Sequence, residues 1–75
     1  MKKYEITNIY GQFTIEEFWN GRYYVYGNIK AARFEFKNIG KMPPNEYGNF
    51  YGREKAGFEA CKTIIKKYYG ESYEI

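Results

Sequence analysis

Apolar and polar residues alternate through the first half of the chain in a pattern that predicts β-strands. Residues 4–10 alternate between aromatic or apolar residues and mostly polar ones, and the stretch ends at Gly11. A period of two is typical of a strand with one buried face. Residues 32–37 repeat this period and place Phe34 and Phe36 on the same side, so we expect a further strand there.

A β-hairpin is predicted around Asn20-Gly21, because this dipeptide favours the two-residue type I′ turn and its flanks are rich in aromatic and β-branched residues. Such a turn places Phe18 opposite Tyr23, and this register decides which side chains share a face. We expect the core face to carry Phe13, Ile15, Glu17, Trp19, Arg22, Tyr24 and Tyr26. We expect the other face, at least partly exposed, to carry Thr14, Glu16, Phe18, Tyr23 and Val25.

The spacing of apolar residues becomes helical between residues 53 and 69. They recur there at steps of three and four, which is typical of an amphipathic α-helix, and Gly70 stands where a C-cap belongs. The apolar residues are Phe58, Cys61, Ile64, Ile65 and Tyr68. Gly57 disfavours a helix interior, so it either allows a close approach to the sheet or marks a later helix start.

Residues 38–52 form an irregular connection, because they contain many residues typical of turns or extended backbone. These are Gly40, Pro43, Pro44, Gly48 and Gly52. A connection of this length is unusual in a compact domain. It predicts a binding loop, a mobile segment or a short strand that the pattern does not reveal. Its aromatic residues make it too apolar for a free linker, so we expect some of Tyr47, Phe50 and Tyr51 to dock.

These elements predict one small α+β domain over residues 1–75. We expect a three- or four-stranded, mostly antiparallel sheet over about residues 3–37, a long loop over 38–52, and one C-terminal helix over 53–69 that packs on the sheet. A helix is only about 10–12 Å across, side chains included, so it cannot cover both faces of such a sheet. One face should stay partly exposed unless the loop or a second subunit covers it, and a homodimer is therefore an open alternative.

The composition argues against catalysis. The chain has ten Tyr but no His, Asp or Leu, which removes the usual general base and the usual zinc ligand. Its nucleophiles are Cys61, Ser72 and three Thr, and we expect Cys61 to be a buried apolar residue rather than a reactive thiol. We expect no enzyme activity, no cofactor and no metal site.

Charge and codon usage suggest where the chain works. Its net charge is +3, and a single Cys excludes an internal disulfide, which fits a reducing cytosol. The apolar runs are too short for a secretory signal or a membrane span, so we expect a cytoplasmic protein without a membrane partner. The abundant Phe, Tyr, Met, Ile, Asn and Lys have AT-rich codons and indicate a low-GC bacterium or one of its phages.

The leading functional expectation is a protein-binding module. Tyr, Trp and Arg are enriched in interface hot spots, and the expected binding residues are Phe18, Trp19, Arg22, Tyr23, Tyr47, Phe50 and Tyr51, with Trp19 and Arg22 stacked across the hairpin tip. In size and composition the tyrosine-rich chain resembles the small inhibitors that phages and mobile elements direct against host nucleases, including anti-CRISPR proteins. The resemblance implies stoichiometric inhibition of a nuclease or nucleoprotein complex.

The alternative is a nucleic-acid-binding module that stacks bases on an aromatic sheet face and neutralises phosphates with nearby cations. Its residues would be Tyr24, Tyr26, Lys30, Arg33 and Lys37. The order strand, hairpin, strand, helix, with the helix start Glu54-Lys55-Ala56-Gly57-Phe58-Glu59-Ala60, resembles over residues 12–70 the three-stranded-sheet-plus-helix DNA-binding domains of the AP2 and integrase-arm type. The resemblance implies DNA contact through the sheet.

Overall fold

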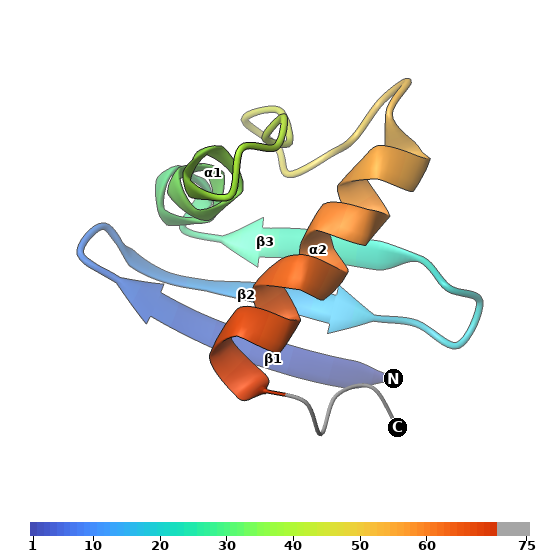
Figure 1. Ribbon diagram of the computed structural model, residues 1–75, viewed down its shortest axis with the longest axis horizontal. Coiled ribbons are helices and arrows are strands. Elements are labelled where there is room, and N and C mark those ends of the chain that lie inside the picture. The colour runs from blue at the N-terminus through green and yellow to red at the C-terminus, as the bar shows by residue number, and fades with distance from the viewer. Residues whose placement is uncertain (71–75) are drawn as a thin grey trace.

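The computed structural model describes residues 1–70, which form a three-stranded antiparallel sheet and two helices. The strands β1 (Lys2–Asn8), β2 (Gly11–Glu17) and β3 (Tyr23–Gly27) pair in the order β1-β2-β3. The helices α1 (Ile29–Asn38) and α2 (Glu54–Tyr69) follow. In Figure 1 α2 crosses in front of the strands, while α1 lies beyond β3, near the end of the sheet where β1 turns into β2. The predicted α+β fold with a C-terminal helix is confirmed.

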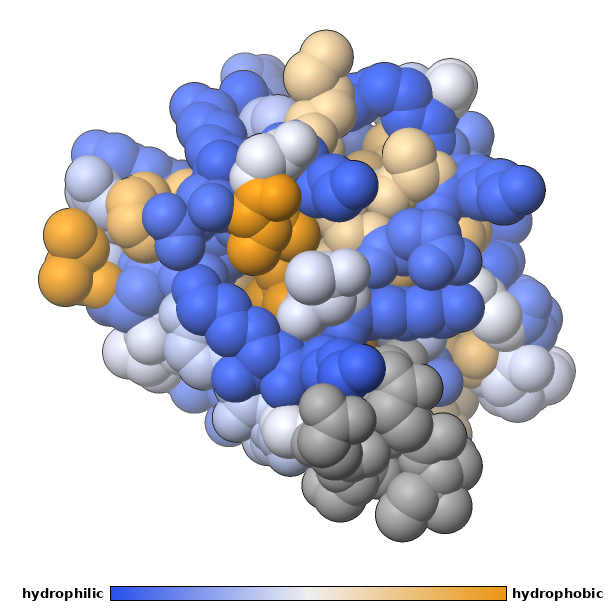
Figure 2. All heavy atoms as spheres, viewed as in Figure 1, coloured by the Kyte–Doolittle hydropathy of each residue, from blue (hydrophilic) through white to orange (hydrophobic). Residues whose placement is uncertain are grey.

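The core lies between one face of the sheet and the two helices. The buried apolar residues of the strands are Tyr4, Ile6, Phe13, Ile15, Tyr23 and Val25, and those of the helices are Ala31, Ala32, Phe36, Ala60, Cys61, Ile64 and Ile65. Figure 2 shows the side that α2 covers, where hydrophilic side chains dominate around smaller hydrophobic areas. Isoleucine and aromatic side chains thus build the core without any Leu.

No helix of residues 1–70 covers the opposite face of the sheet (Figure 1). Its outward side chains alternate with the core residues along each strand. They are Lys3, Glu5, Thr7, Gln12, Thr14, Glu16, Tyr24 and Tyr26, and none of them is buried. One layer of helices therefore leaves a sheet face open, as the size of a helix implies.

The β2–β3 hairpin closes through a three-residue turn, so the predicted two-residue turn is wrong. The N–H of Phe18 donates to the carbonyl of Arg22 at 2.9 Å, and that of Gly21 donates to the carbonyl of Phe18 at 3.0 Å. Gly21 has a φ of 81°, and no non-glycine residue of the described chain has a positive φ. Asn20 therefore does not adopt the type I′ conformation, and Gly21 alone supplies the left-handed residue that a three-residue turn needs.

The longer turn shifts β3 by one residue from the predicted register. Glu17 pairs with Tyr23 rather than with Tyr24. A shift of one residue moves every side chain of a strand to the other face. Tyr23 and Val25 are therefore buried at 4% and 3% exposure, whereas Tyr24 and Tyr26, which we expected in the core, lie outside at 42% and 40%.

The predicted fourth strand at residues 32–37 is wrong, because this segment belongs to α1. The side chain of Asn28 caps the helix by accepting a 3.1 Å hydrogen bond from the N–H of Ala31. The buried positions follow a helical spacing, namely Ala31, Ala32, Glu35 and Phe36. Phe34 is exposed while Phe36 is fully buried, so the two rings do not share a side.

The loop between the helices, residues 39–53, is held by its own hydrogen bonds. Asn45 Oδ1 accepts from the N–H of Tyr47 at 2.8 Å and from the N–H of Asn49 at 3.0 Å. The guanidinium of Arg53 donates to the carbonyl of Pro43 at 3.2 Å. These bonds stabilise an irregular path that has no strand.

The same loop packs against both β3 and α2. Gly48 has a φ of 84° and lies so close to Val25 of the edge strand that a Cβ atom would overlap the carbonyl oxygen of Val25. Phe50 is buried, and a Cβ atom at Gly57 of α2 would overlap its ring. The expectation that part of the loop docks is therefore met by Phe50. The glycine inside the predicted helix serves a close approach to the loop rather than to the sheet.

Candidate functional site

Exposed aromatic residues gather at the end of the sheet where β2 turns into β3. The rings of Phe18 and Trp19 lie 6.1 Å apart, and those of Phe18 and Tyr24 lie 4.9 Å apart in an edge-to-face arrangement. The guanidinium carbon of Arg22 lies 5.9 Å from the ring centres of both Tyr24 and Phe58. We call this the hairpin-end surface and define it as Phe18, Trp19, Arg22, Tyr24, Tyr51 and Phe58.

The three-residue turn holds the tip of this surface. Asn20 Oδ1 accepts a 3.0 Å hydrogen bond from the N–H of Arg22, in addition to the two backbone bonds across the turn. Trp19 at the tip is 83% exposed. A large ring that stays in solvent on a hydrogen-bonded turn costs little further conformational entropy when a partner covers it.

Two shallow clefts flank the tip. One, of about 60 Å³, joins the hairpin to the loop and to α2. It is lined by Arg22, Tyr23, Tyr24, Gly48, Asn49, Phe50, Tyr51, Glu54 and Phe58. The other, of about 160 Å³, is lined by Met1, Lys2, Glu17, Phe18 and Trp19. Both are too small for an ordinary small-molecule ligand, whose sites occupy about 300–1,000 Å³.

The charged side chains that line the two clefts are of both signs. Arg22 and Lys2 stand against Glu54 and Glu17 in the lining of the two clefts. An aromatic centre with mixed charges around it is the usual composition of a protein–protein interface. A nucleic-acid surface would instead show an excess of cations.

The structure brings together part of the predicted protein-binding set. Phe18, Trp19, Arg22 and Tyr51 lie in the hairpin-end surface, but Arg22 stacks on Tyr24 and Phe58 rather than on Trp19. Tyr23 and Phe50, also predicted to bind a partner, are core residues at 4% and 5% exposure that border the smaller cleft from below. Tyr23 is buried by the shifted register, and Phe50 by its contact with α2.

Tyr47, the remaining member of the predicted set, stands apart. Its side chain is 75% exposed, yet it lines neither of the two clefts of the hairpin-end surface. Tyr24 and Phe58, in contrast, belong to that surface although the sequence placed neither in a protein-binding site. Their role depends on the β3 register and on the packing of α2, which local patterns do not encode.

A second surface lies on α1. Lys30, Arg33 and Lys37 line a groove of about 400 Å³, so the cations of the alternative prediction do converge, although on a helix rather than beside a sheet face. The walls of this α1 groove are Tyr10, Ile29 and Phe34, and Glu46 is the acidic residue in its lining. Tyr24 and Tyr26, the predicted stacking residues, lie on the outer sheet face and do not line it.

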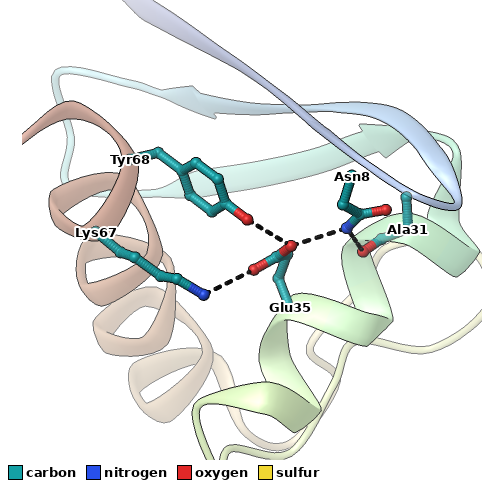
Figure 3. Close-up of polar contacts among 5 residues, drawn as sticks. All are labelled: Asn8, Ala31, Glu35, Lys67 and Tyr68. Atoms are coloured by element: carbon teal, nitrogen blue, oxygen red, sulfur yellow. Dashed lines mark hydrogen bonds and ion pairs between the residues drawn. The ribbon is translucent and has the colours of Figure 1, made fainter.

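A buried carboxylate of α1 connects this helix to β1 and α2 (Figure 3). Glu35 of α1 is 1% exposed. Its carboxylate accepts hydrogen bonds from Asn8 Nδ2 at 2.8 Å and from the Tyr68 hydroxyl at 2.7 Å, and Lys67 Nζ lies 3.4 Å away. The Asn8 amide also donates to the carbonyl of Ala31 at 3.0 Å. The cluster ties the end of β1 and the end of α2 to α1.

These contacts lower the pKa of Glu35 and raise the pKa of Tyr68. Burial alone would raise the pKa of Glu35, but the donors Tyr68 and Asn8 and the charge of Lys67 together lower it below its ordinary value. Burial and the bond to the carboxylate raise the pKa of Tyr68 to about 12. Both shifts favour an ionised Glu35 beside a neutral Tyr68, an arrangement that stabilises the junction.

The remaining reactive groups do not form a centre in the described part of the chain. Burial raises the pKa of the Cys61 thiol, which is fully enclosed in the core, and Ser72 lies outside the described residues. Within residues 1–70, His, Cys, Asp and Glu side chains do not cluster in groups of three or more that could hold a metal ion. Neither α1 nor α2 is long and apolar enough to cross a membrane.

Comparison with known proteins found no relative of this chain. No family model matches the chain, and no curated protein and no solved structure matches it.

Proposed function

We propose that this chain is a non-catalytic binding protein that docks on another protein through the hairpin-end surface. The observation that carries the proposal is the series of ring contacts that starts at the highly exposed Trp19, continues through Phe18 and Tyr24, and ends where Arg22 lies over Phe58. Trp, Tyr and Arg are the residues most enriched in interface hot spots. Here they are contiguous: Tyr24 lies on the outer face of the sheet, and Arg22 extends from it to the ring of Phe58 on α2.

A protein partner fits this surface better than a nucleic acid does. Two cationic and two anionic side chains line its clefts, so these side chains provide no excess of positive charge for a phosphate backbone. Apolar rings surrounded by charges of both signs match the core and rim of a protein interface. The clefts are shallow, which favours a broad protein surface over a small ligand.

For the partner we propose a nucleic-acid-processing protein of a bacterial cell, inhibited in the cytoplasm by stoichiometric binding. The likeness in size and composition to small phage-encoded inhibitors supports this choice. An aromatic tip on a hydrogen-bonded turn would act by covering a site or by holding one conformation of its target, and neither mechanism requires catalysis. Self-association through the uncovered sheet face stays a separate prediction, and sedimentation as a 9.0 kDa monomer at high concentration would contradict it.

Affinity capture from a bacterial lysate, with and without nuclease treatment, tests the proposal. The wild-type chain should retain a protein in both preparations. Trp19→Ala and Arg22→Ala should each weaken binding of the recovered protein by about tenfold or more, because truncation of a hot-spot residue costs about 2 kcal/mol. Neither residue belongs to the buried core, so circular dichroism should show an unchanged fold.

Tyr47→Ala is the matched control, because Tyr47 is 75% exposed but lies outside the hairpin-end surface. It should leave capture unchanged. The proposal fails if Trp19→Ala binds as tightly as the wild type, or if nuclease treatment abolishes the capture.

A further inference from the structure

The α1 groove combines a row of cations with aromatic walls. We propose that it binds single-stranded nucleic acid, with phosphates on Lys30, Arg33 and Lys37 and a base stacked at Tyr10 and Phe34. This inference goes beyond the protein-binding function proposed above and does not depend on it. Proteins that bind single strands commonly pair a cationic groove with aromatic stacking residues.

The three cations lie along one side of α1. Steps of three and four residues return to the same side of a helix, and the seven-residue span from Lys30 to Lys37 covers about 10 Å along the axis. A row of this length matches an extended polyanion better than a single point charge. All three residues line the groove, and among residues 1–70 Glu46 is the one acidic side chain in its lining.

The acidic residue within the helix does not neutralise this row. Glu35 lies on the buried side of α1, where its carboxylate is bound by Asn8, Tyr68 and Lys67. The ammonium of Lys67 therefore offsets the charge of Glu35 inside the fold. The groove keeps an excess of positive charge, and polyanions are attracted to such a site.

The aromatic walls give the groove a feature that plain electrostatic binding does not need. The rings of Tyr10 and Phe34 lie 5.2 Å apart at an angle of 55°, and the side chains are 39% and 37% exposed. Lys30 Nζ lies over the ring of Tyr10, 5.1 Å from its centre, so a phosphate bound by Lys30 would lie close to a base stacked at these rings. A volume of about 400 Å³ lies within the range of ordinary ligand sites.

A single strand fits this site better than a duplex. Bases paired in a helix cannot stack on protein rings, whereas an unpaired base can insert between side chains. Stacking on aromatic rings also tolerates any base, so the proposal implies little sequence preference. An acidic peptide is the competing occupant, because it would use the cations but gain no base stacking.

The groove and the hairpin-end surface lie at opposite ends of β2. Tyr10 belongs to the turn between β1 and β2, whereas Trp19 belongs to the turn between β2 and β3 (Figure 1). A seven-residue strand separates them by roughly 20 Å. Substitutions at one site should therefore leave the other unchanged, and the two proposals can fail separately.

Fluorescence anisotropy of a labelled oligothymidylate of about ten nucleotides tests the inference, with the full chain titrated at several salt concentrations. If three phosphates are neutralised, the logarithm of the association constant should fall with the logarithm of salt at a slope of about −2. Lys30→Ala, Arg33→Ala and Lys37→Ala should each reduce the slope by about 0.7.

Phe34→Ala separates stacking from charge. It should weaken binding by about tenfold, the loss expected for one stacked base, without changing the salt slope. Phe34→Tyr keeps a ring at this position and should restore the affinity. Since Phe34 is an exposed helix residue and Ala favours helices, circular dichroism should show that both variants keep the fold.

Lys55→Ala is the matched charge control, because Lys55 is an exposed cation of α2 that does not line the groove. It should leave the affinity and the slope near the wild-type values, and Trp19→Ala should do the same. The inference is overturned if the oligonucleotide does not bind, or if Lys55→Ala weakens binding as much as Lys30→Ala. It is also overturned if Phe34→Ala binds normally, or if a labelled oligoglutamate of similar length binds equally well.

Discussion

In α2 the backbone of Gly57 lies directly against the ring of Phe50, so that a Cβ atom at residue 57 would overlap the ring atoms Cγ and Cδ1. Phe50 is enclosed on its other sides as well, since its ring centre lies 5.6 Å from that of Phe36 and 6.0 Å from that of Phe58. The contact fixes the long loop to α2. It also supports Phe58, over which Arg22 of the hairpin-end surface lies.

Gly57→Ala should therefore destabilise the protein. Ala is better than Gly inside a helix by about 1 kcal/mol, but here the added methyl group would force a buried ring to move, and overpacking of a core costs about 1–3 kcal/mol. We expect the free energy of unfolding in urea to fall by up to about 2 kcal/mol.

A double-mutant cycle with Phe50→Leu identifies the cause. When the smaller side chain relieves the overlap, Gly57→Ala should become neutral or stabilising relative to Phe50→Leu alone. An increase in stability for Gly57→Ala in the wild-type background would show that Phe50 yields at no cost, and the contact would then not be the reason for glycine.

The β3 register predicts opposite behaviour for two adjacent tyrosines. Tyr23→Ala should cost about 3 kcal/mol, because it removes a ring that is 4% exposed in the core. Tyr24→Ala should cost less than about 1 kcal/mol, because that ring is 42% exposed on the outer face. Urea denaturation of both variants measures the difference. A larger loss for Tyr24→Ala would support the register expected for a two-residue turn.

The same pair of tyrosines shows what the sequence could and could not predict. The hairpin itself follows from Asn20-Gly21 between two runs rich in strand-forming residues. The register does not, because this dipeptide fits a two-residue turn with both residues left-handed and a three-residue turn with only Gly21 left-handed. The choice between them moves Tyr23 and Tyr24 to opposite faces.

The error at residues 32–37 has a different cause. A run of six residues with two Phe two positions apart matches a strand, but the pattern is too short to exclude a helix. The helical signal covers a longer stretch, from the N-cap Asn28 through the buried Ala31, Ala32 and Phe36. The pattern predicts the C-terminal helix with nearly its observed bounds, because the apolar spacing repeats over about three turns and the stretch ends at a glycine.

The sequence predicts those candidate site residues whose type alone favours an exposed binding side chain. It misses those whose place in the site depends on tertiary packing. Trp19 and Arg22 flank the predicted turn and are exposed at the tip of the hairpin in the structure. The cations Lys30, Arg33 and Lys37 were selected as a set, but the rings beside them come from α1 itself and from the distant Tyr10. No local pattern brings Tyr10 to α1, since this contact depends on the path of the chain through β2 and β3.

The Glu35 cluster predicts a specific response to acid. Its pKa is lowered in the folded state from an ordinary value of 4.5, so the ionised form binds its donors most strongly in the fold. The contribution to stability is complete above about pH 4.5 and is lost as the pH falls through the lower folded value. Glu35→Gln should cost about 1–3 kcal/mol at neutral pH.

The difference between the wild type and Glu35→Gln should shrink on acidification, because protonation removes from the wild type the charge that the variant lacks already. Urea denaturation over a pH series measures it. Glu16→Gln is the control, since Glu16 accepts only an exposed hydrogen bond from Tyr26 and its replacement should leave both stability and its pH dependence nearly unchanged. A gap for Glu35→Gln that stays constant down to acid pH would contradict this account.

Cys61 should report on unfolding of the whole core. Its thiol is 0% exposed among the residues that join the helices to the sheet, and burial raises its pKa, so neither access nor the reactive thiolate is available in the folded state. A thiol reagent should modify the native chain more slowly than the urea-unfolded chain by about a thousandfold or more, the ratio set by ordinary domain stability.

Gly57→Ala should accelerate labelling of Cys61 in the native chain by the factor that its own loss of stability implies, about tenfold for 1.4 kcal/mol. Tyr24→Ala should change the labelling rate little. Rapid labelling of the wild type, or a rate that does not follow the stability of the variants, would mean that the core opens locally around α2.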